Sequence, residues 1–286
     1  MLIEVEYMAR ELTFEQQVER SIIKTYRNDI WNPFVEACKC YKLIEAGDKI
    51  AVCISGGKDS VLLAMCMKHL HKYSDVPFEL EFICMDPGYN EANRKQIEYN
   101  CKILNIPIKI FNTNIFDVTT SVGGSPCYLC ARMRRGHLYA KAKELGCNKI
   151  ALGHHLSDVI ETTVMGMFYG AQLQAMLPKL KSTNFEEMEL IRPLYCVNEE
   201  SVIKWRNYND LTFIQCACRF VDEYSKSEDG IGTSKRQEIK KLIAHLKQIN
   251  PDIEHNIFKS IHNVKLDTFL GYKQKGTEHS FLEQWD

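Results

Sequence analysis

Six consecutive residues, Ser55-Gly56-Gly57-Lys58-Asp59-Ser60, combine two glycines with a cation, a carboxylate and two hydroxyls. Glycine lets the backbone approach phosphate oxygens, and the amide hydrogens at a helix start point at an anion placed there. Lys58 can neutralise phosphate charge, and Ser55 and Ser60 can donate hydrogen bonds. Asp59 would be repelled by a polyphosphate unless Mg²⁺ lay between them. The hexapeptide predicts a phosphate loop with Mg²⁺, in which Lys58 and Asp59 are catalytic; the alternative is a plain Gly-Gly turn.

The surroundings of this loop narrow its chemistry. An apolar run at 50–54 precedes it and a helical pattern follows it, so it lies at the carboxyl end of a strand, where open α/β sheets bind ligands. The loop lacks the Gly-x-x-x-x-Gly-Lys-Ser/Thr spacing of the Walker A motif. A kinase or GTPase mechanism is therefore disfavoured.

A second polar group, Gly153-His154-His155 followed by Asp158, comes directly after another strand-like run. A single histidine at such a position is more often structural than catalytic. Two histidines beside a glycine and an acid indicate a ligand site instead. We expect Gly153 and His154 to help bind the nucleotide, and Asp158 to act as a Mg²⁺ ligand or an acid–base group.

The cysteines are numerous, with twelve in the chain, and most are expected in the core. Cys127-Tyr-Leu-Cys130 has a spacing that lets both sulfurs meet one metal, although such a pair alone is equally consistent with a redox or an incidental role. Cys216-Ala-Cys218 can bring a third thiolate to the same place. Three protein ligands leave one metal position open, whereas four form the closed geometry of structural zinc.

Three arginines follow the first cysteine pair at the start of an expected helix. Arg132, Arg134 and Arg135 would stabilise thiolates there, because cations and helix starts lower the pKa of cysteine. The whole chain carries 36 Lys plus Arg against 37 Asp plus Glu, for a net charge of -1. Any nucleic-acid site must therefore be a local basic patch, and these arginines are its candidates.

The elements that must position these residues follow an alternating pattern. Short apolar runs at 49–55, 78–86, 106–112, 149–153 and 190–195 read as strands, and helical patterns at 59–73, 91–104, 131–145 and 157–169 lie between them. This alternation is typical of an α/β fold with a parallel sheet of about five strands and helices on both faces.

Helical additions are expected at both ends of the chain. Residues 1–45 have apolar residues at spacings of four, 46–223 form the nucleotide domain with the cysteine site, and 224–286 form a polar loop followed by amphipathic helices. No hydrophobic stretch near the N-terminus has the length of a signal peptide or a membrane span. We expect a cytoplasmic protein without membrane contact.

The hexapeptide at 55–60 resembles the PP-loop of the ATP pyrophosphatases, which cleave ATP between its α and β phosphates. Further segments together resemble the TtcA family of tRNA 2-thiocytidine synthetases, a group with the adenine nucleotide alpha hydrolase-like fold. These segments are 127–136 (CYLCARMRRG), 150–158 (IALGHHLSD), 160–170 (IETTVMGMFYG), 177–181 (LPKLK) and 191–194 (IRPL). The resemblance covers residues 45–220, and more weakly the remainder.

This resemblance implies an ATP- and Mg²⁺-dependent enzyme that adds sulfur at C2 of a tRNA pyrimidine. It implies a [4Fe-4S] cluster on Cys127, Cys130 and Cys216, with Cys218 as the rival third ligand, because the family has Cys-x-x-Cys where this chain has Cys-x-Cys. Sulfur would come from a cysteine desulfurase or from sulfide. The resemblance also implies a homodimer, and it leaves open cytidine or uridine as the target.

Two other functions fit some of the same residues. One is a PP-loop ligase in which the cysteines bind structural zinc. The other is a non-enzymatic iron-sulfur sensor or RNA-binding module with a vestigial nucleotide site; the intact residues 55–60 and the GHHxxD run argue against it.

Overall fold

The computed structural model describes residues 11–113, 115, 126–214 and 235–285. The chain divides into two compact units. The first contains Met1–Asp158 and Leu177–Gly232, and the second contains Val159–Met176 and Thr233–Asp286. The predicted domain boundary at residue 224 lies outside the described residues.

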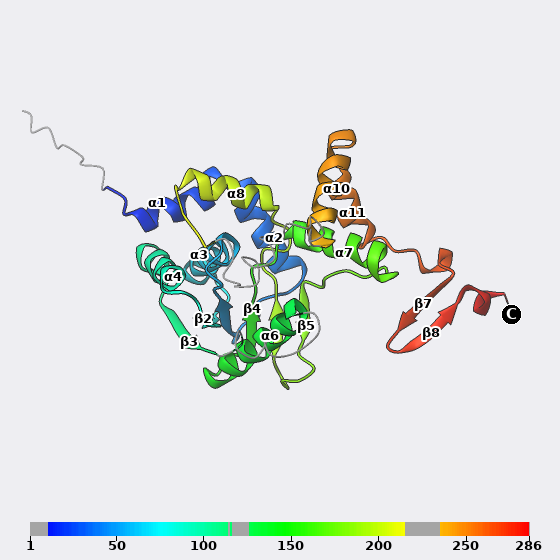
Figure 1. Cartoon of the computed structure of the whole chain (residues 1–286), viewed down its shortest axis with the longest axis horizontal. Helices are drawn as coiled ribbons and strands as arrows, with labels where there is room; N and C mark the ends of the chain where they lie inside the picture. The colour runs from blue at the N-terminus through cyan, green and yellow to red at the C-terminus, as the bar shows by residue number, and fades with distance from the viewer. Residues whose placement is uncertain (1–10, 114, 116–125, 215–234, 286) are drawn as a thin grey trace, which may run out of the picture. The chain divides into compact units, whose positions relative to one another are not determined.

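The first unit is built on a six-stranded sheet with the order β3-β2-β1-β4-β6-β5. Figure 1 labels β2, β3, β4 and β5 of this sheet. Its strands are β1 (Lys49–Cys53), β2 (Glu79–Asp86), β3 (Ile108–Asn112), β4 (Lys149–Ala151), β5 (Lys179–Lys181) and β6 (Glu189–Ile191). β1 to β4 and β6 are joined by parallel pairings, whereas β5 pairs with β6 in antiparallel fashion. The predicted α/β fold is confirmed, with a sheet that has six strands and is parallel except for β5.

Two details of the sheet differ from the sequence expectation. The strand expected at 190–195 is the short β6, because Pro193 lacks an amide donor and the chain turns there, with Tyr195 N–H donating to Arg192 C=O at 3.1 Å. The edge strand β5 was not expected. Its three residues are too few for a periodic pattern.

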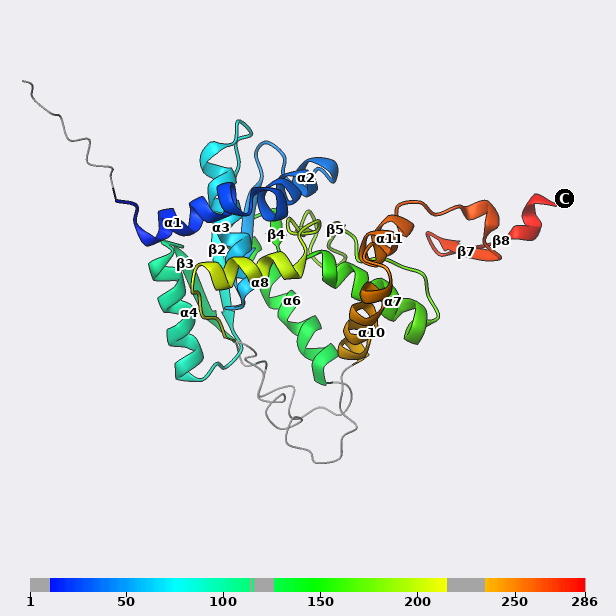
Figure 2. The ribbon, with the colours of Figure 1, turned by 90° about the horizontal axis from the view of Figure 1, so that it is seen from above.

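Helices cover both faces of the sheet (Figure 2). Those of the first unit are α1 (Phe14–Arg20), α2 (Asn32–Cys40), α3 (Lys58–Tyr73), α4 (Glu91–Ile103), α6 (Pro126–Glu144) and α8 (Glu199–Tyr208). The first three residues of α7 (Leu156–Gly170) also belong to this unit. Two π-helical turns, Ser21–Thr25 and Arg27–Trp31, join α1 to α2. The expected N-terminal helical segment is present from Phe14 onward.

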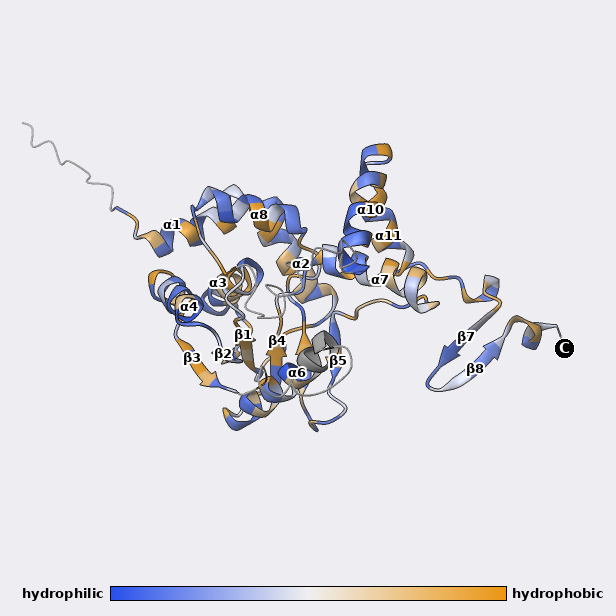
Figure 3. Cartoon of the chain, viewed as in Figure 1, coloured by the Kyte–Doolittle hydropathy of each residue, from blue (hydrophilic) through white to orange (hydrophobic). Residues whose placement is uncertain are grey.

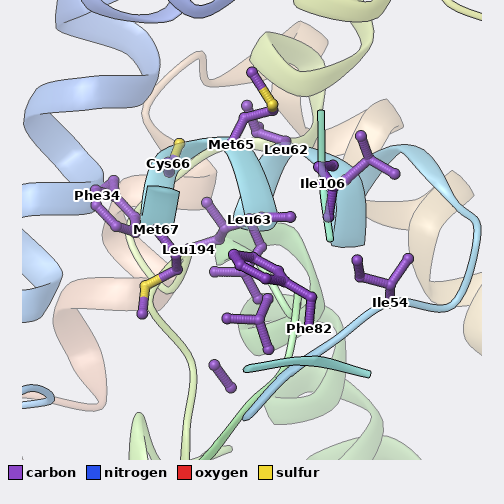
Figure 4. Close-up of a cluster of buried hydrophobic side chains, with 14 of the residues drawn as sticks. Phe34, Ile54, Leu62, Leu63, Met65, Cys66, Met67, Phe82, Ile106 and Leu194 are labelled. Atoms are coloured by element: carbon purple, nitrogen blue, oxygen red, sulfur yellow. The ribbon is translucent and has the colours of Figure 1, made fainter. Parts of the chain in front are cut away.

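Alternation along β1 divides the core into two layers. Ile50 and Val52 face the larger cluster, which also holds α3, α4, α8 and the N-terminal helices. Ala51 and Cys53 face the other cluster, together with Tyr139 of α6. Figure 3 shows the central strands β1 and β4 as mainly hydrophobic, and Figure 4 shows part of the larger cluster around α3. Burial on both faces explains why these strands are continuous apolar runs.

The second unit contains the body of α7, the helices α10 (Lys235–Ile249) and α11 (Ile253–Ser260), and a hairpin of β7 (Gly271–Gln274) and β8 (Thr277–Ser280). Short 3₁₀ turns at Leu266–Thr268 and Phe281–Gln284 flank the hairpin. Arg236 of α10 pairs with Glu161 of α7 at 3.3 Å, and Tyr169 donates to Glu238 at 2.6 Å. The helices α10 and α11 were expected from their periodicity, and the hairpin was not. Within the described ranges, no helix is both long and apolar enough to cross a membrane.

Candidate active site

The phosphate loop joins the carboxyl end of β1 to the start of α3. Gly56 adopts φ +84°, and a Cβ there would lie 2.6 Å from Cγ1 of Ile97 and 2.7 Å from Cδ1 of Ile214. Only glycine fits both the backbone conformation and the space. Gly57 is the N-cap of α3 and has no side chain to cap the helix. The first amides of α3 are therefore left for another acceptor, as an anion site requires.

Ser60 holds the shape of this loop. Its hydroxyl accepts hydrogen bonds from the Ser55 amide at 3.1 Å and the Ser55 hydroxyl at 3.2 Å, and it donates to Gly57 C=O at 2.9 Å. The two predicted phosphate-binding serines thus bond to each other. These hydrogen bonds fix the turn between β1 and α3.

Lys58 and Asp59, the two charged residues of the loop, form an ion pair with Nζ to Oδ2 at 3.1 Å. Lys58 Nζ also lies 3.2 Å from Oε1 of Glu199, at the start of α8. The neighbouring carboxylates outweigh burial and raise the pKa of Lys58, so the ammonium stays charged. Sequence reasoning missed Glu199, because one acid in the first turn of a helix is an ordinary pattern.

The GHHxxD run brings its side chains beside the phosphate loop. His155 is buried, with Nε2 3.7 Å from Oδ1 of Asp59 and Nδ1 3.4 Å from Oδ2 of Asp158. A Cβ on Gly153 would lie 3.1 Å from the Asp59 and Ser60 backbone, so β4 and α3 meet closely there. His154 is half-buried in the same segment. The structure thus places Gly153, His155 and Asp158 near Asp59, and His155 rather than His154 makes the link.

Asp59 has one oxygen whose surroundings suit a cation. Its Oδ1 is buried and accepts no hydrogen bond within the described part of the chain. A buried carboxylate oxygen without a donor is costly unless a cation or a ligand completes it. The described residues contain no group of three His, Cys, Asp or Glu that could hold a metal by themselves. Mg²⁺ bound here would therefore take further oxygen ligands from phosphate and water.

Tyr89 fixes the loop from the side of β2. Its hydroxyl donates to Ser55 C=O at 3.4 Å, and its amide donates to Oδ1 of the buried Asp86 at 2.7 Å. Burial raises the pKa of Tyr89 to about 12, against the opposing effect of the nearby Arg134 guanidinium. Arg134, one of the predicted tRNA-binding residues, therefore lies beside the phosphate loop.

Arg192 connects two segments of the family resemblance. It follows β6, is 5 % exposed, and donates through Nη1 to Leu177 C=O, while its amide donates to Pro178 C=O at 3.0 Å. Burial lowers its pKa to about 10, with Arg135 acting in the same direction. Arg135, a second predicted tRNA-binding residue, is thus close to the carboxyl end of β6. The side chain of Arg132 lies outside what the structure describes.

The described cysteines separate into core residues and candidate ligands. Seven are partly or fully buried, and burial raises the pKa of their thiols: Cys38, Cys53, Cys66, Cys84, Cys101, Cys147 and Cys196. Cys40 is exposed. The expectation that most cysteines belong to the core therefore agrees with the structure.

The remaining four cysteines are the predicted ligands and the rival third ligand. The backbone positions of Cys127 and Cys130 lie three residues apart in the first turns of α6, on one helix face. Cys216 and Cys218 lie outside the described residues. The ligand set therefore stays a prediction.

The glycine loop lies at the carboxyl end of β1 in a mostly parallel sheet, and polar side chains from the end of β4 join it there. This arrangement is typical of α/β enzymes that use a nucleoside triphosphate. The family model described as PP-loop domain matches residues 15–226. A tRNA-cytidine(32) 2-sulfurtransferase of Geobacter sulfurreducens is 33% identical over 82% of this chain and 90% of its own length. Its counterparts in Alkalilimnicola ehrlichii and Syntrophotalea carbinolica are each 36% identical, over 85% and 79% of this chain and 75% and 85% of theirs. This chain belongs to the PP-loop family and, within it, to the tRNA 2-sulfurtransferases, so the predicted resemblance is confirmed.

A solved structure supports the fold. The U34-tRNA thiolase NcsA from Methanococcus maripaludis, described with its [4Fe-4S] cluster, matches with a TM-score of 0.60 over 88% of this chain and 80% of its own, at 21% identity. At that identity the likeness shows a shared fold. The α/β architecture around the PP-loop is therefore common to both chains.

Proposed function

We propose that this chain is an ATP-dependent sulfurtransferase that replaces the C2 oxygen of a tRNA cytidine by sulfur, with position 32 as the target. The observation that carries the proposal is the phosphate loop with the buried Asp59 Oδ1 beside His155, which in turn contacts Asp158, in a chain of this family. The name that the relatives share favours cytidine over uridine.

The first step is adenylation of the base. The C2 oxygen of cytidine attacks the α-phosphorus of ATP; an oxygen–phosphorus bond forms, the bond to the bridging oxygen of the β-phosphate breaks, and pyrophosphate leaves. Residues 55–60 and the start of α3 bind the phosphates, and Lys58 with Mg²⁺ neutralises the charge that develops on pyrophosphate. Asp59, and Asp158 positioned by His155, are the proposed Mg²⁺ ligands.

The second step exchanges oxygen for sulfur. Sulfide forms a bond to C2, the C2–oxygen bond breaks, and AMP leaves, so the base and the sulfur undergo no net oxidation or reduction. Cys127 and Cys130 would hold a [4Fe-4S] cluster with Cys216, or with Cys218 in its place, and that cluster would supply an iron with an open position for sulfide. Arg132, Arg134 and Arg135, which follow in α6, are the proposed contacts to tRNA phosphates. A cysteine desulfurase or sulfide itself is the proposed sulfur source.

The substrate is tested by nucleoside mass spectrometry of tRNA from a strain that lacks this protein. We expect loss of 2-thiocytidine and its return when the wild-type gene is restored. Loss of a 2-thiouridine instead would reassign the base. Unchanged thionucleosides would contradict the proposed activity.

The cysteine site is tested by Cys127→Ala and Cys130→Ala in the same complementation assay. Each change should abolish thiolation, because two ligands are too few to retain a four-iron cluster. Cys40→Ala, at an exposed thiol that is not among the proposed ligands, is the control and should restore thiolation. Iron and acid-labile sulfide in anaerobically purified protein would support the cluster, whereas zinc without sulfide would indicate a structural metal site.

A further inference from the structure

Two carboxylates hold the Lys58 ammonium, and one of them comes from a distant part of the sequence. Nζ of Lys58 lies 3.1 Å from Asp59 and 3.2 Å from Glu199, which is 141 residues further along the chain. The side chains of Lys58 and Glu199 are 19% and 17% exposed. Partial burial makes such a pair stronger than the usual surface ion pair.

The backbone of Glu199 is fixed independently of its side chain. Asn198 caps α8 by accepting a hydrogen bond from Glu200 N–H at 2.8 Å, and Glu199 N–H donates to the Ser157 hydroxyl at 3.3 Å. Val202 and Trp205, further along α8, are fully buried in the larger core cluster. Glu199 therefore presents its carboxylate from a helix start that is tied both to the core and to the residue before Asp158.

We propose that Glu199 is a positioning residue that orients Lys58 toward the phosphate loop before ATP binds. This inference rests on the proposed adenylation step. A long lysine side chain loses rotamer entropy when it is fixed in one conformation. A carboxylate on a rigid helix start removes that freedom in advance, so the ammonium already lies beside the site of the developing negative charge.

The same carboxylate should favour the reaction rate but weaken the binding of the nucleotide. Its negative charge repels the triphosphate, and it competes with the phosphates for Lys58. Removal of Glu199 should therefore slow the reaction without weakening the binding of MgATP. A purely structural role would lower stability, binding and rate together.

The test compares Glu199→Ala and Glu199→Gln with the control Glu200→Ala. Glu200 is the next residue of α8, its side chain is 59% exposed, and it pairs with Lys204. We expect kcat for tRNA-dependent pyrophosphate release to fall about tenfold or more in Glu199→Ala. The Kd for MgATP, measured by calorimetry, should be unchanged or lower. Glu199→Gln should be intermediate, because its amide oxygen still accepts from Lys58, and Glu200→Ala should match the wild type.

A second measurement does not depend on turnover. The rate at which acetic anhydride acetylates Lys58, followed by peptide mass spectrometry, should rise severalfold in Glu199→Ala and remain unchanged in Glu200→Ala. Equal acetylation rates in wild type and Glu199→Ala would overturn the inference, as would parallel loss of kcat, MgATP affinity and thermal stability. If the wild type releases no pyrophosphate with any tRNA, the proposed function fails, and the acetylation rates still decide whether Glu199 positions Lys58.

Discussion

Gly56 lies where the chain leaves β1 for α3, and both its backbone and its surroundings exclude a side chain. At φ +84° an L-residue is strained by about 1–3 kcal/mol, and a Cβ would also press on Ile97 and Ile214. Gly56→Ala should therefore lower the free energy of unfolding and abolish MgATP binding, as measured by urea titration and calorimetry.

Gly57 provides the matched comparison for this stability change. Its φ is -84°, and the nearest atom to an added Cβ is Ser55 Oγ at 3.7 Å. Gly57→Ala should keep nearly the wild-type unfolding free energy. Equal destabilisation by the two substitutions would show that the backbone conformation of Gly56 is not the cause of the loss in unfolding free energy.

The sequence predicted the residue types of the site better than their partners. Ser55 to Ser60 could be found because glycines, a lysine and an acid stand together after a strand. Glu199 and Tyr89 could not be found in this way, because only the fold brings them to the loop. Glu199 contacts Lys58, and Tyr89 donates to Ser55 C=O. His155 was recognised as part of a polar run, but its contact with Asp59 depends on β1 and β4 being neighbours.

At the scale of elements, a buried ion cluster ties the amino ends of β1, β4 and β6 together, opposite the phosphate loop. Lys149 of β4 is 2 % exposed and lies 2.7 Å from Asp48, 3.3 Å from Glu45 and 3.5 Å from Glu189. Lys149→Met would leave the buried Asp48 without its cation and should cost about 3–5 kcal/mol in urea unfolding.

An exposed lysine serves as the control for that measurement. The Lys95 and Glu91 side chains of α4 pair at 2.6 Å, yet they are 72% and 81% exposed. Lys95→Met should change the unfolding free energy by about 0.5 kcal/mol or less. A similar loss for both lysines would mean that burial of the cluster is not the cause.

The same cluster should make stability depend on pH. Hydrogen bonds from Lys149 and Lys179 hold the pKa of Glu45 below its ordinary value of 4.5. The folded state therefore binds this proton less tightly than the unfolded state, so the contribution of Glu45 is present above pH 4.5 and is lost as the pH falls through the lowered pKa. Urea unfolding between pH 6 and pH 3 should show a smaller acid-induced loss for Glu45→Gln than for the wild type. An identical loss would contradict this assignment.

Most elements could be predicted from periodicity, and the exceptions have physical reasons. α8 was missed because most of its residues are polar and only Val202 and Trp205 are buried. The hairpin of β7 and β8 has mostly exposed residues, so no alternation of apolar and polar side chains marks it. Contacts such as Tyr169 to Glu238, which join residues 69 apart, assign the body of α7 to the second compact unit, and no local pattern encodes them.

At the scale of the whole molecule, the net charge of -1 gives no general attraction to RNA. Binding of tRNA should therefore depend on a few local cations. Arg134→Gln and Arg135→Gln should each weaken tRNA binding and reduce the slope of log K against log salt by about 1, if each contacts a phosphate. Filter binding at several salt concentrations measures this slope.

The control for this prediction is Lys95→Gln, on the exposed face of α4. It should leave the slope unchanged, since Lys95 is not among the proposed contacts. MgATP affinity should also be retained in the arginine variants. A uniform loss of affinity in all three variants would point to a diffuse charge effect instead.

The separation of 141 residues along the chain from Lys58 to Glu199 also sets the order in which the protein can acquire its activity during synthesis. At typical translation rates, the ribosome needs on the order of ten seconds to add the chain that separates them. α8 is absent for the whole of that interval, and β4 and the GHHxxD run are absent for the larger part of it, so the nascent phosphate loop lacks its partners in the site. The nucleotide should instead act on the completed protein, where binding to the assembled site stabilises the folded state by mass action.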